Sequence, residues 1–138
     1  MRIKGKVSWW FYAMIIGIGG ILMPIMIMAL IDGSLTVLIF NAIIFLALEI
    51  FCISIVFHNY VELQEDSLLV VFGFIKQNIP YSDIVTLART SNPSSSLAAS
   101  FDRIEIQCKK QSNIMISVIN KDTFFNEMKK RNSSITIL

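Results

Sequence analysis

Residues 9–31 read WWFYAMIIGIGGILMPIMIMALI, residues 32–34 read DGS, and residues 35–57 read LTVLIFNAIIFLALEIFCISIVF. At a rise of about 1.5 Å per residue, each apolar run is long enough to cross a hydrocarbon core of about 30 Å as an α-helix. The short segment between them has the composition of a turn that reverses the chain. This stretch therefore predicts a transmembrane helical hairpin over residues 9–58, with helices at about 9–31 and 35–57.

The basic residues before the first run predict its orientation. Arg2, Lys4 and Lys6 precede it, whereas the loop at 32–34 contains no Lys or Arg. Short loops rich in Lys and Arg stay in the cytoplasm, so we expect residues 1–8 to be a basic cytoplasmic N-terminus and both termini to be cytoplasmic. The sequence thus predicts a multi-pass membrane protein, with the lipid bilayer as its first partner.

A secretory signal peptide is the alternative interpretation of the first run, because a positively charged segment precedes it. The apolar run is longer than the hydrophobic region of such a peptide, and no Ala-x-Ala-like cleavage site comes before the second run. We therefore favour the hairpin.

Two polar side chains, Asn41 and Glu49, lie inside the second run and share one helix face. An unpaired carboxylate in hydrocarbon costs several kcal/mol. Folding the hairpin about Gly33 places Glu49 at the depth of Gly17, where residues 17–20 would let the helices approach closely. The polar face either contacts a partner or an antimicrobial peptide, or holds the hairpin or a homo-oligomer together through backbone carbonyls, including one freed by Pro24.

Composition separates the chain into two parts. The chain is 54% hydrophobic and 16% charged, and the apolar excess lies before residue 58. A net charge of +2 without a nucleic-acid-binding motif argues against a nucleic acid partner. Cys52 lies in the apolar part and Cys108 in the polar part, so we interpret both as free thiols of a protein facing the cytoplasm.

Catalysis has little support in this sequence. The single histidine, His58, stands at the predicted membrane boundary, without a carboxylate pair, a Cys-His arrangement or a glycine-rich phosphate loop. There is also no cluster of metal ligands. We expect no enzyme activity and no cofactor or metal.

From His58 onward, alternation of apolar and polar residues predicts short antiparallel strands, and a final amphipathic segment predicts a helix that begins after Asn120. The basic residues at 129–131 either offset the helix dipole or attract anionic lipid. The fold class is therefore an α+β membrane protein, with a cytoplasmic β-domain over residues 59–138 that ends in one α-helix. The predicted strands lie at about 61–63, 68–72, 74–79, 84–87, 104–108 and 114–118.

The remaining candidates for partner binding follow the fourth predicted strand. Ser94 and Ser95 belong to a serine-rich loop at residues 91–100, and Arg103 begins the next strand. Together with Asn41 and Glu49 they form our set of candidate partner-binding residues. For Arg103 an alternative role is a hydrogen bond to the backbone at the edge of a strand.

Several motifs of the polar part resemble a known family. They are FGFI at 72–75, IPYSDI at 79–84, NP at 92–93, SFDRIEI at 100–106 and IS at 116–117, followed by a helix that carries phenylalanines. This pattern resembles the small bacterial pleckstrin-homology-like domains found behind membrane helices, over most of residues 60–131. Val118 departs from it, because a proline usually follows Ile-Ser.

Within that group, a short chain with an N-terminal membrane anchor is similar to the sublancin-type bacteriocin immunity proteins. The resemblance implies that the protein protects a producing cell from a secreted antimicrobial peptide by occluding the peptide or its membrane target. The alternative is a housekeeping scaffold whose β-domain docks a membrane protein or lipid headgroups.

Overall fold

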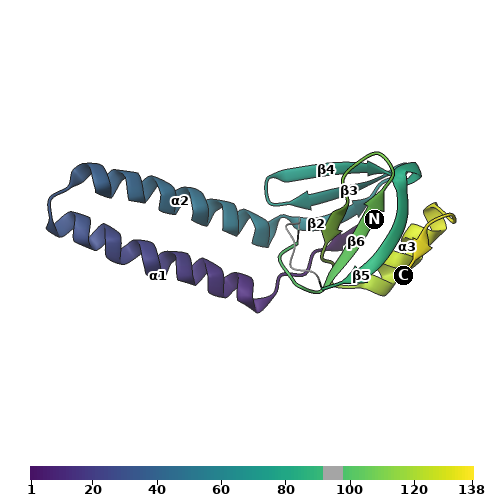
Figure 1. Ribbon diagram of the computed structural model, residues 1–138, viewed down its shortest axis with the longest axis horizontal. Coiled ribbons are helices and arrows are strands. Elements are labelled where there is room, and N and C mark those ends of the chain that lie inside the picture. Colours follow the sequence, from purple (N-terminus) through teal and green to yellow (C-terminus); the bar gives the residue numbers. More distant parts are fainter. Residues whose placement is uncertain (92–97) are drawn as a thin grey trace.

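The computed structural model describes residues 1–91 and 98–138, and places an apolar hairpin at one end and a β-domain at the other (Figure 1). Helices α1 (Trp9–Ile31) and α2 (Leu35–Phe57) lie antiparallel, with the bounds that the sequence predicts. Between them Gly33 has φ 67°, a left-handed conformation that glycine adopts without steric cost, and Asp32 N–H donates to Met28 O at 2.9 Å. The turn thus closes α1 and starts α2 within three residues.

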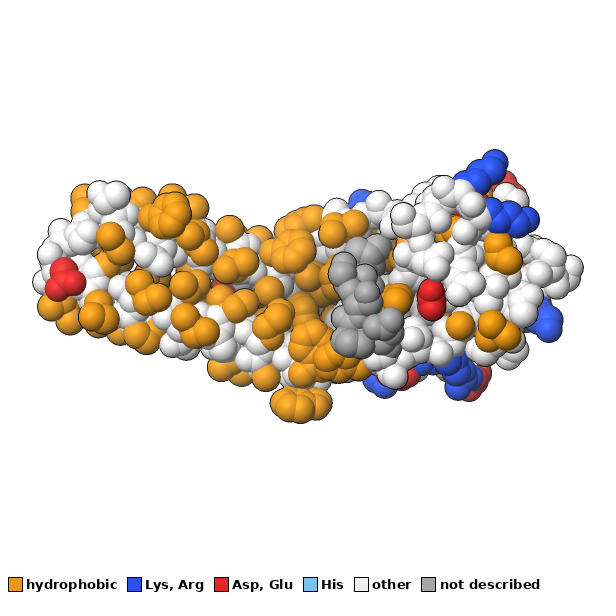
Figure 2. All heavy atoms as spheres, viewed as in Figure 1, with side chains coloured by type: hydrophobic (Ala, Val, Ile, Leu, Met, Phe, Trp, Pro, Cys, Tyr) orange, Lys and Arg blue, Asp and Glu red, His pale blue; other side chains and the backbone are white. Residues whose placement is uncertain are grey.

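The hairpin exposes its apolar side chains, as Figure 2 shows. In the most apolar window of each helix only 6% of α1 and 17% of α2 is buried. Both helices are long and apolar enough to cross a membrane. A core helix of a soluble protein with this composition would be mostly buried, so the hairpin has the surface of a segment that lies in an apolar solvent.

The predicted close approach of the two helices at residues 17–20 is not formed. A Cβ atom added to Gly17 or Gly20 would meet nothing within 4 Å, and one at Gly19 would meet only the Phe45 ring at 3.9 Å. Gly17 and Gly20 therefore face away from α2.

Two four-stranded sheets make the β-domain. The first has the order β1-β2-β3-β4 and is antiparallel throughout, and the second has the order β7-β6-β5-β8, with β8 parallel to β5. A bridge between Gly5 and Val118 joins them. The elements are β1 (Arg2–Lys4), β2 (Asn59–Leu63), β3 (Ser67–Phe72), β4 (Ile75–Pro80), a 3-10 turn (Tyr81–Asp83), β5 (Ile84–Thr90), β6 (Arg103–Cys108), β7 (Ile114–Ile116), α3 (Lys121–Arg131) and β8 (Thr136–Ile137).

The first strand comes from the segment that the sequence analysis treated as a separate basic N-terminus. Arg2 pairs with Glu62 and Lys4 with Tyr60, so β1 forms the edge of the first sheet. Ile3 between them is only 7% exposed and belongs to the core. Residues 1–8 are thus part of the β-domain, although the whole hairpin separates them from it along the chain.

The core lies between the sheets and α3. Side chains from both sheets are fully buried there, and the amphipathic helix α3 contributes Phe124, Phe125 and Met128. Strand β3 serves two regions, because Leu68 and Val70 belong to this core while Phe72 packs against the hairpin. Cys52 and Cys108 are free thiols, as predicted.

Candidate functional site at the junction of hairpin and β-domain

The structure does not bring the predicted site residues into one cluster. Asn41 and Glu49 are half-buried on α2, and Asn41 Nδ2 donates to Val37 O of its own helix at 2.9 Å. Glu49 makes no hydrogen bond or ion pair within the described residues. Arg103 is buried in the β-domain, and Ser94 and Ser95 lie outside the described residues.

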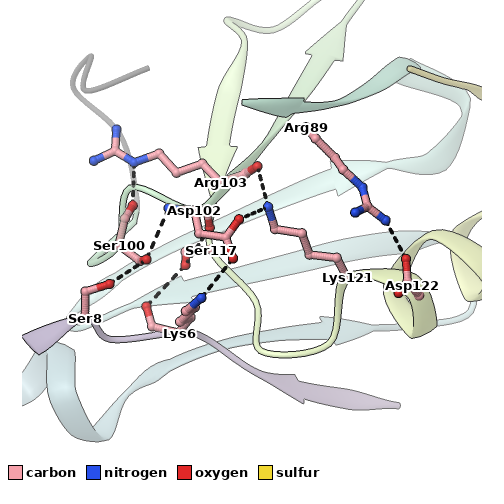
Figure 3. A network of polar contacts seen from close by, with 9 residues as sticks. All are labelled: Lys6, Ser8, Arg89, Ser100, Asp102, Arg103, Ser117, Lys121 and Asp122. Atoms are coloured by element: carbon pink, nitrogen blue, oxygen red, sulfur yellow. Dashed lines mark hydrogen bonds and ion pairs between the residues drawn. The ribbon is translucent and has the colours of Figure 1, made fainter. Parts of the chain in front are cut away.

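A polar network joins the start of α1 to the β-domain (Figure 3). Its centre is Asp102, whose two carboxylate oxygens accept from Lys6 Nζ at 2.9 Å and from Lys121 Nζ. These two hydrogen bonds, to Lys121 first and then to Lys6, lower the pKa of Asp102. Ser117 Oγ lies 3.2 Å from both Lys6 O and Asp102 O. Four chain segments therefore meet at Asp102, two of them through its carboxylate.

Arg103 extends this network beneath the surface. It is 4% exposed, and its Nε donates to Ser100 O at 2.6 Å, the backbone role that was the alternative for this residue. Burial lowers the pKa of its guanidinium group. The hydroxyl of Ser100 contacts the Ser8 hydroxyl at 2.7 Å, and Ser8 N–H donates to Ala99 O at 3.0 Å. Arg103 thus orders the segment that receives α1.

An apolar cluster lies between the hairpin and the first sheet. Phe11 of α1, Cys52 and Ile55 of α2, and Phe72 of β3 are each at most 8% exposed in it. The cluster is continuous across the two parts of the molecule, so the hairpin and the β-domain pack as neighbours rather than as separate units on a linker.

The turn between β3 and β4 packs against α2. Gly73 has φ 61°, and a Cβ atom there would lie 2.7 Å from Ser54 Oγ and 2.9 Å from a side-chain carbon of Ile55. Its N–H donates to His58 O at 2.7 Å. Only glycine satisfies both the backbone conformation and this close approach. The next residue, Phe74, is 66% exposed, and its ring lies 6.5 Å from that of Phe51 on α2.

Exposed aromatic side chains surround this junction. Trp9 and Phe57, at the β-domain ends of α1 and α2, are 80% and 77% exposed. Phe101 is 46% exposed and stacks on Trp10 with ring centroids 5.0 Å apart. Aromatic side chains favour the interface between hydrocarbon and water. Their positions define the level at which the apolar surface of the hairpin ends.

A cavity of about 410 Å³ opens beside the junction. Its lining combines the last residues of α2 with β1 and the start of β2, namely Arg2, Lys4, Gly5, His58, Asn59 and Tyr60. The guanidinium of Arg2 lies over the Tyr60 ring, 4.2 Å from its centroid, and pairs with Glu62 at 3.3 Å. The sequence analysis missed this basic cavity, because its residues come from segments more than fifty positions apart.

The junction has the chemistry of a binding surface: lysine and arginine side chains, buried backbone contacts and an aromatic rim. Within residues 1–91 and 98–138 no three His, Cys, Asp or Glu side chains lie close enough together to hold a metal ion. The basic residues predicted to act at the end of α3 lie elsewhere, where Lys130 and Arg131 each pair with Glu127 at 2.8 Å.

Comparison with known proteins assigns the β-domain. The model of a family described as bacterial PH domain matches residues 59–132, which are more than half of the chain. No curated protein and no solved structure matches significantly. The matched region begins at β2, so the strand β1 that completes the first sheet lies outside it.

Proposed function

The chain belongs to the bacterial PH domain family, and on that basis we propose that it is a non-catalytic, membrane-anchored binding module. Its hairpin crosses the membrane of a bacterial cell, and its β-domain is held at the cytoplasmic face. The exposed apolar surface of both helices supports insertion, and the basic residues of β1 opposite a loop without Lys or Arg support the orientation.

The structure also argues against removal of α1 as a signal peptide. Cleavage after α1 would remove β1 from the first sheet and with it the buried side chain of Ile3. It would also remove Lys6 and Ser8 from the polar network. An N-terminal segment that completes a folded domain supports a retained membrane anchor.

The specific role that we propose is protection of the cell from a secreted antimicrobial peptide, by occlusion of the peptide or of the membrane component that it exploits. The single observation that carries this role is the fixed junction. One residue, His58, separates α2 from β2. The polar network and the apolar cluster hold the first residues of α1 against the β-domain. A domain fixed in this way covers the same area of membrane surface at all times.

Expression of the protein in a sensitive strain tests this role. We expect increased survival against one peptide or a narrow group of peptides. As a matched comparison, Gly73→Val disturbs the contact of the β-domain with Ser54 and Ile55, whereas Gly33→Val changes a glycine of the same conformation with open space around it. Protection should fall more with the first variant at equal protein level. Unchanged killing by every peptide would exclude the protective role.

The orientation has its own test. A cysteine at Ser34, beside the turn glycine Gly33, should react with a membrane-impermeant maleimide added outside intact cells, and a reporter fused after Leu138 should be active in the cytoplasm. Reaction of Ser34→Cys only in opened cells would reverse the proposed topology.

A second candidate function, docking of another membrane protein as a scaffold, is favoured by Glu49. Its carboxylate is half-buried on α2 and has no hydrogen bond within the described residues. A polar group at that depth is stabilised by a hydrogen-bonding partner. Under this function Glu49→Gln should retain partner co-purification while Glu49→Leu abolishes it. Retention with both variants would show that no partner contacts this residue.

A further inference from the structure

We propose that the free edge of β4 binds an extended juxtamembrane segment of another membrane protein, which adds to the first sheet as a further strand. The segment runs toward the bilayer, leads into a transmembrane helix, and carries an acidic residue between apolar ones. This inference rests on the proposed insertion of the hairpin, and it names the surface and the partner class for the docking function. It does not depend on the protective role.

Strand β4 is the last strand of the first sheet, and β3 is its one neighbour among the described strands. A two-residue loop joins the two strands, so its flanking residues Phe72 and Ile75 form the hydrogen-bonded pair that closes the hairpin. Alternation along the ladder then directs the backbone groups of Lys76 and Asn78 away from β3. Both residues are exposed, and no described residue bonds these groups. The edge therefore offers donors and acceptors to a further strand.

The proline at the end of β4 agrees with this register. Pro80 pairs with Ser67, at a position where the backbone nitrogen faces away from β3. Proline has no N–H to donate, and in sheets it occurs where that group would point away from the neighbouring strand. The next residue, Tyr81, donates its N–H to Asp66 O at 3.1 Å, as the alternation requires. The outward groups of β4 are thus assigned consistently along its length.

Strand β4 begins at the hairpin and runs away from it. The loop before it contacts Ser54 and Ile55 of α2 through Gly73. Figure 1 shows β4 extending along the long axis of the molecule, on the same side as α2. With the hairpin in a membrane, β4 runs from the membrane surface into the cytoplasm. A chain that approaches the bilayer beside α2 would lie along β4 and antiparallel to it, which is the more stable way for two strands to pair.

The direction of β4 disfavours a second copy of this chain as the occupant. Two identical strands pair antiparallel about a two-fold axis that is perpendicular to both. Because β4 lies along the axis of the hairpin, that rotation would point the second hairpin in the opposite direction, away from the membrane that holds the first. Two copies in one membrane therefore cannot join their β4 edges in this way.

Side chains around the edge specify the chemistry of the partner. Lys76 lies in a cross-strand row with Lys4, and this row contains no carboxylate. Lys76 makes no ion pair within the described part of the chain. An acidic side chain directly opposite Lys76 would form a favourable cross-strand pair. Nearer the membrane, Phe74 and Ile75 are 66% and 44% exposed, so an apolar residue of the partner would cover them.

A membrane-anchored probe peptide tests the proposal with the full chain in phosphatidylcholine nanodiscs. The probe carries the segment Thr-Val-Glu-Val before a transmembrane helix of leucine and alanine, so antiparallel pairing places its Glu opposite Lys76. NMR measures amide hydrogen exchange. We expect saturating probe to slow exchange of the Lys76 and Asn78 amides by about tenfold or more, because these N–H groups gain acceptors.

A probe that is N-methylated at its Thr and Glu is the matched control. It keeps every side chain but lacks the two N–H groups that face β4 in the proposed pairing. This probe should protect neither amide. Equal protection by the two probes, or protection by neither, would overturn the assignment.

A substitution in β4 tests the edge from the side of the protein. Asn78→Pro removes an outward N–H and leaves the ladder to β3, as Pro80 does two residues later, and should weaken probe binding about fivefold. Asn78→Ala keeps the N–H and should bind like the unmodified protein. Equal binding by all three proteins would overturn the proposal. Thermal melting checks their folding, and if Asn78→Pro melts early the N-methylated probe decides.

Two further measurements distinguish other occupants of the edge. The Thr-Val-Glu-Val segment without its helix should protect neither amide at equal concentration, because membrane anchoring supplies the effective concentration. Equal protection by it would assign the edge to a soluble partner. Protection of Lys76 and Asn78 without any probe, increasing with the number of protein copies per nanodisc, would assign it to a second copy. Neither result changes the cell-survival or cysteine-labelling tests, so failure of this inference and failure of the proposed function are observed separately.

Discussion

The hairpin and the β-domain use similar apolar side chains in opposite ways. The side chain of Phe40 in α2 is 65% exposed, whereas that of Phe124 in α3 is fully buried beneath two sheets. The β-domain gains its stability by removing such surface from water, whereas the hairpin exposes the same kind of surface, which lipid would cover under the proposed insertion. The difference teaches that apolar content alone does not locate a core.

Deletion of β1 is expected to have the largest effect, because it tests whether the β-domain folds without the strand that precedes the hairpin. A fragment of residues 59–138 lacks Arg2–Lys4, which leaves β2 as an unpaired edge and removes Ile3 from the core. We expect this fragment to aggregate or unfold. A second protein, in which residues 9–57 are replaced by a Gly-Ser linker of about five residues, retains β1 and should be soluble and folded.

Circular dichroism and NMR dispersion measure both proteins. If the fragment without β1 folds as well as the linked protein, β1 is an accessory strand and the β-domain is independent of the first eight residues, as the sequence alone suggested.

A core substitution gives the next largest effect. Phe124→Ala should destabilise the β-domain by about 3–5 kcal/mol, because it leaves a cavity in a fully buried site. Phe40→Ala, the same change in the hairpin, should alter β-domain stability by less than about 0.5 kcal/mol. Hydrogen exchange of β5 and β6 amides in the intact protein measures both, and equal effects would mean that the two parts unfold together.

The contact between the two parts is tested by a pair of glycines. Gly73→Ala combines a left-handed φ with a clash against Ser54 and Ile55, and should cost about 2–3 kcal/mol. Gly33→Ala has the same φ penalty without a neighbour within 4 Å, and should cost about 1 kcal/mol. Protease cleavage at the junction compares the two variants, and Gly73→Ala should be cleaved faster than Gly33→Ala. Equal sensitivity would indicate that the β3–β4 turn does not hold the hairpin.

The smallest expected effect is on pH dependence. The pKa of Asp102 is lowered by Lys121 and Lys6, so its contribution is fully present above the pKa of an unfolded aspartate, about 3.9, and is lost as pH falls through the lower folded value. The carboxylate is half-exposed, so Asp102→Asn should cost less than about 1 kcal/mol at neutral pH.

Glu127→Gln is the control for this prediction, because Glu127 pairs only within α3 among the described residues. Acid titration of tryptophan fluorescence, measured in a Trp9→Phe background so that Trp10 is the reporter, should shift for Asp102→Asn alone. A shift of the same size for both variants would place the acid-sensitive step outside the junction.

Local signals predicted much of this fold, and long-range pairing explains what they missed. Helices α1 and α2 have their predicted bounds, because Asp32, Gly33 and Ser34 interrupt an otherwise continuous apolar sequence. Strand β1 has no such signal, since three residues pair with a strand sixty positions away. The same holds for β8, whose two residues pair with β5 only after α3 has returned the chain.

The candidate site was less accessible from sequence. The backbone role of Arg103 follows from its place at the start of a strand, and the structure agrees. The central position of Asp102 in the polar network could not be predicted in this way, because Lys6 and Lys121 reach it from segments far apart in the chain. Residues 17–20 predicted a close helix contact, but spacing along the chain did not determine that Gly17 and Gly20 face away from α2.

The pairing of β1 with β2 also sets an order of events during synthesis. Arg2 is made first, yet its partner Glu62 follows sixty residues later, which at about 5–20 residues per second takes about 3–12 s. During that interval the ribosome delivers the whole hairpin while the first strand has nothing to pair with. Until then the sheet does not constrain Arg2 or Lys4. Under the proposed membrane insertion, the later pairing of β1 with β2 would hold both ends of the hairpin on the same side of the bilayer.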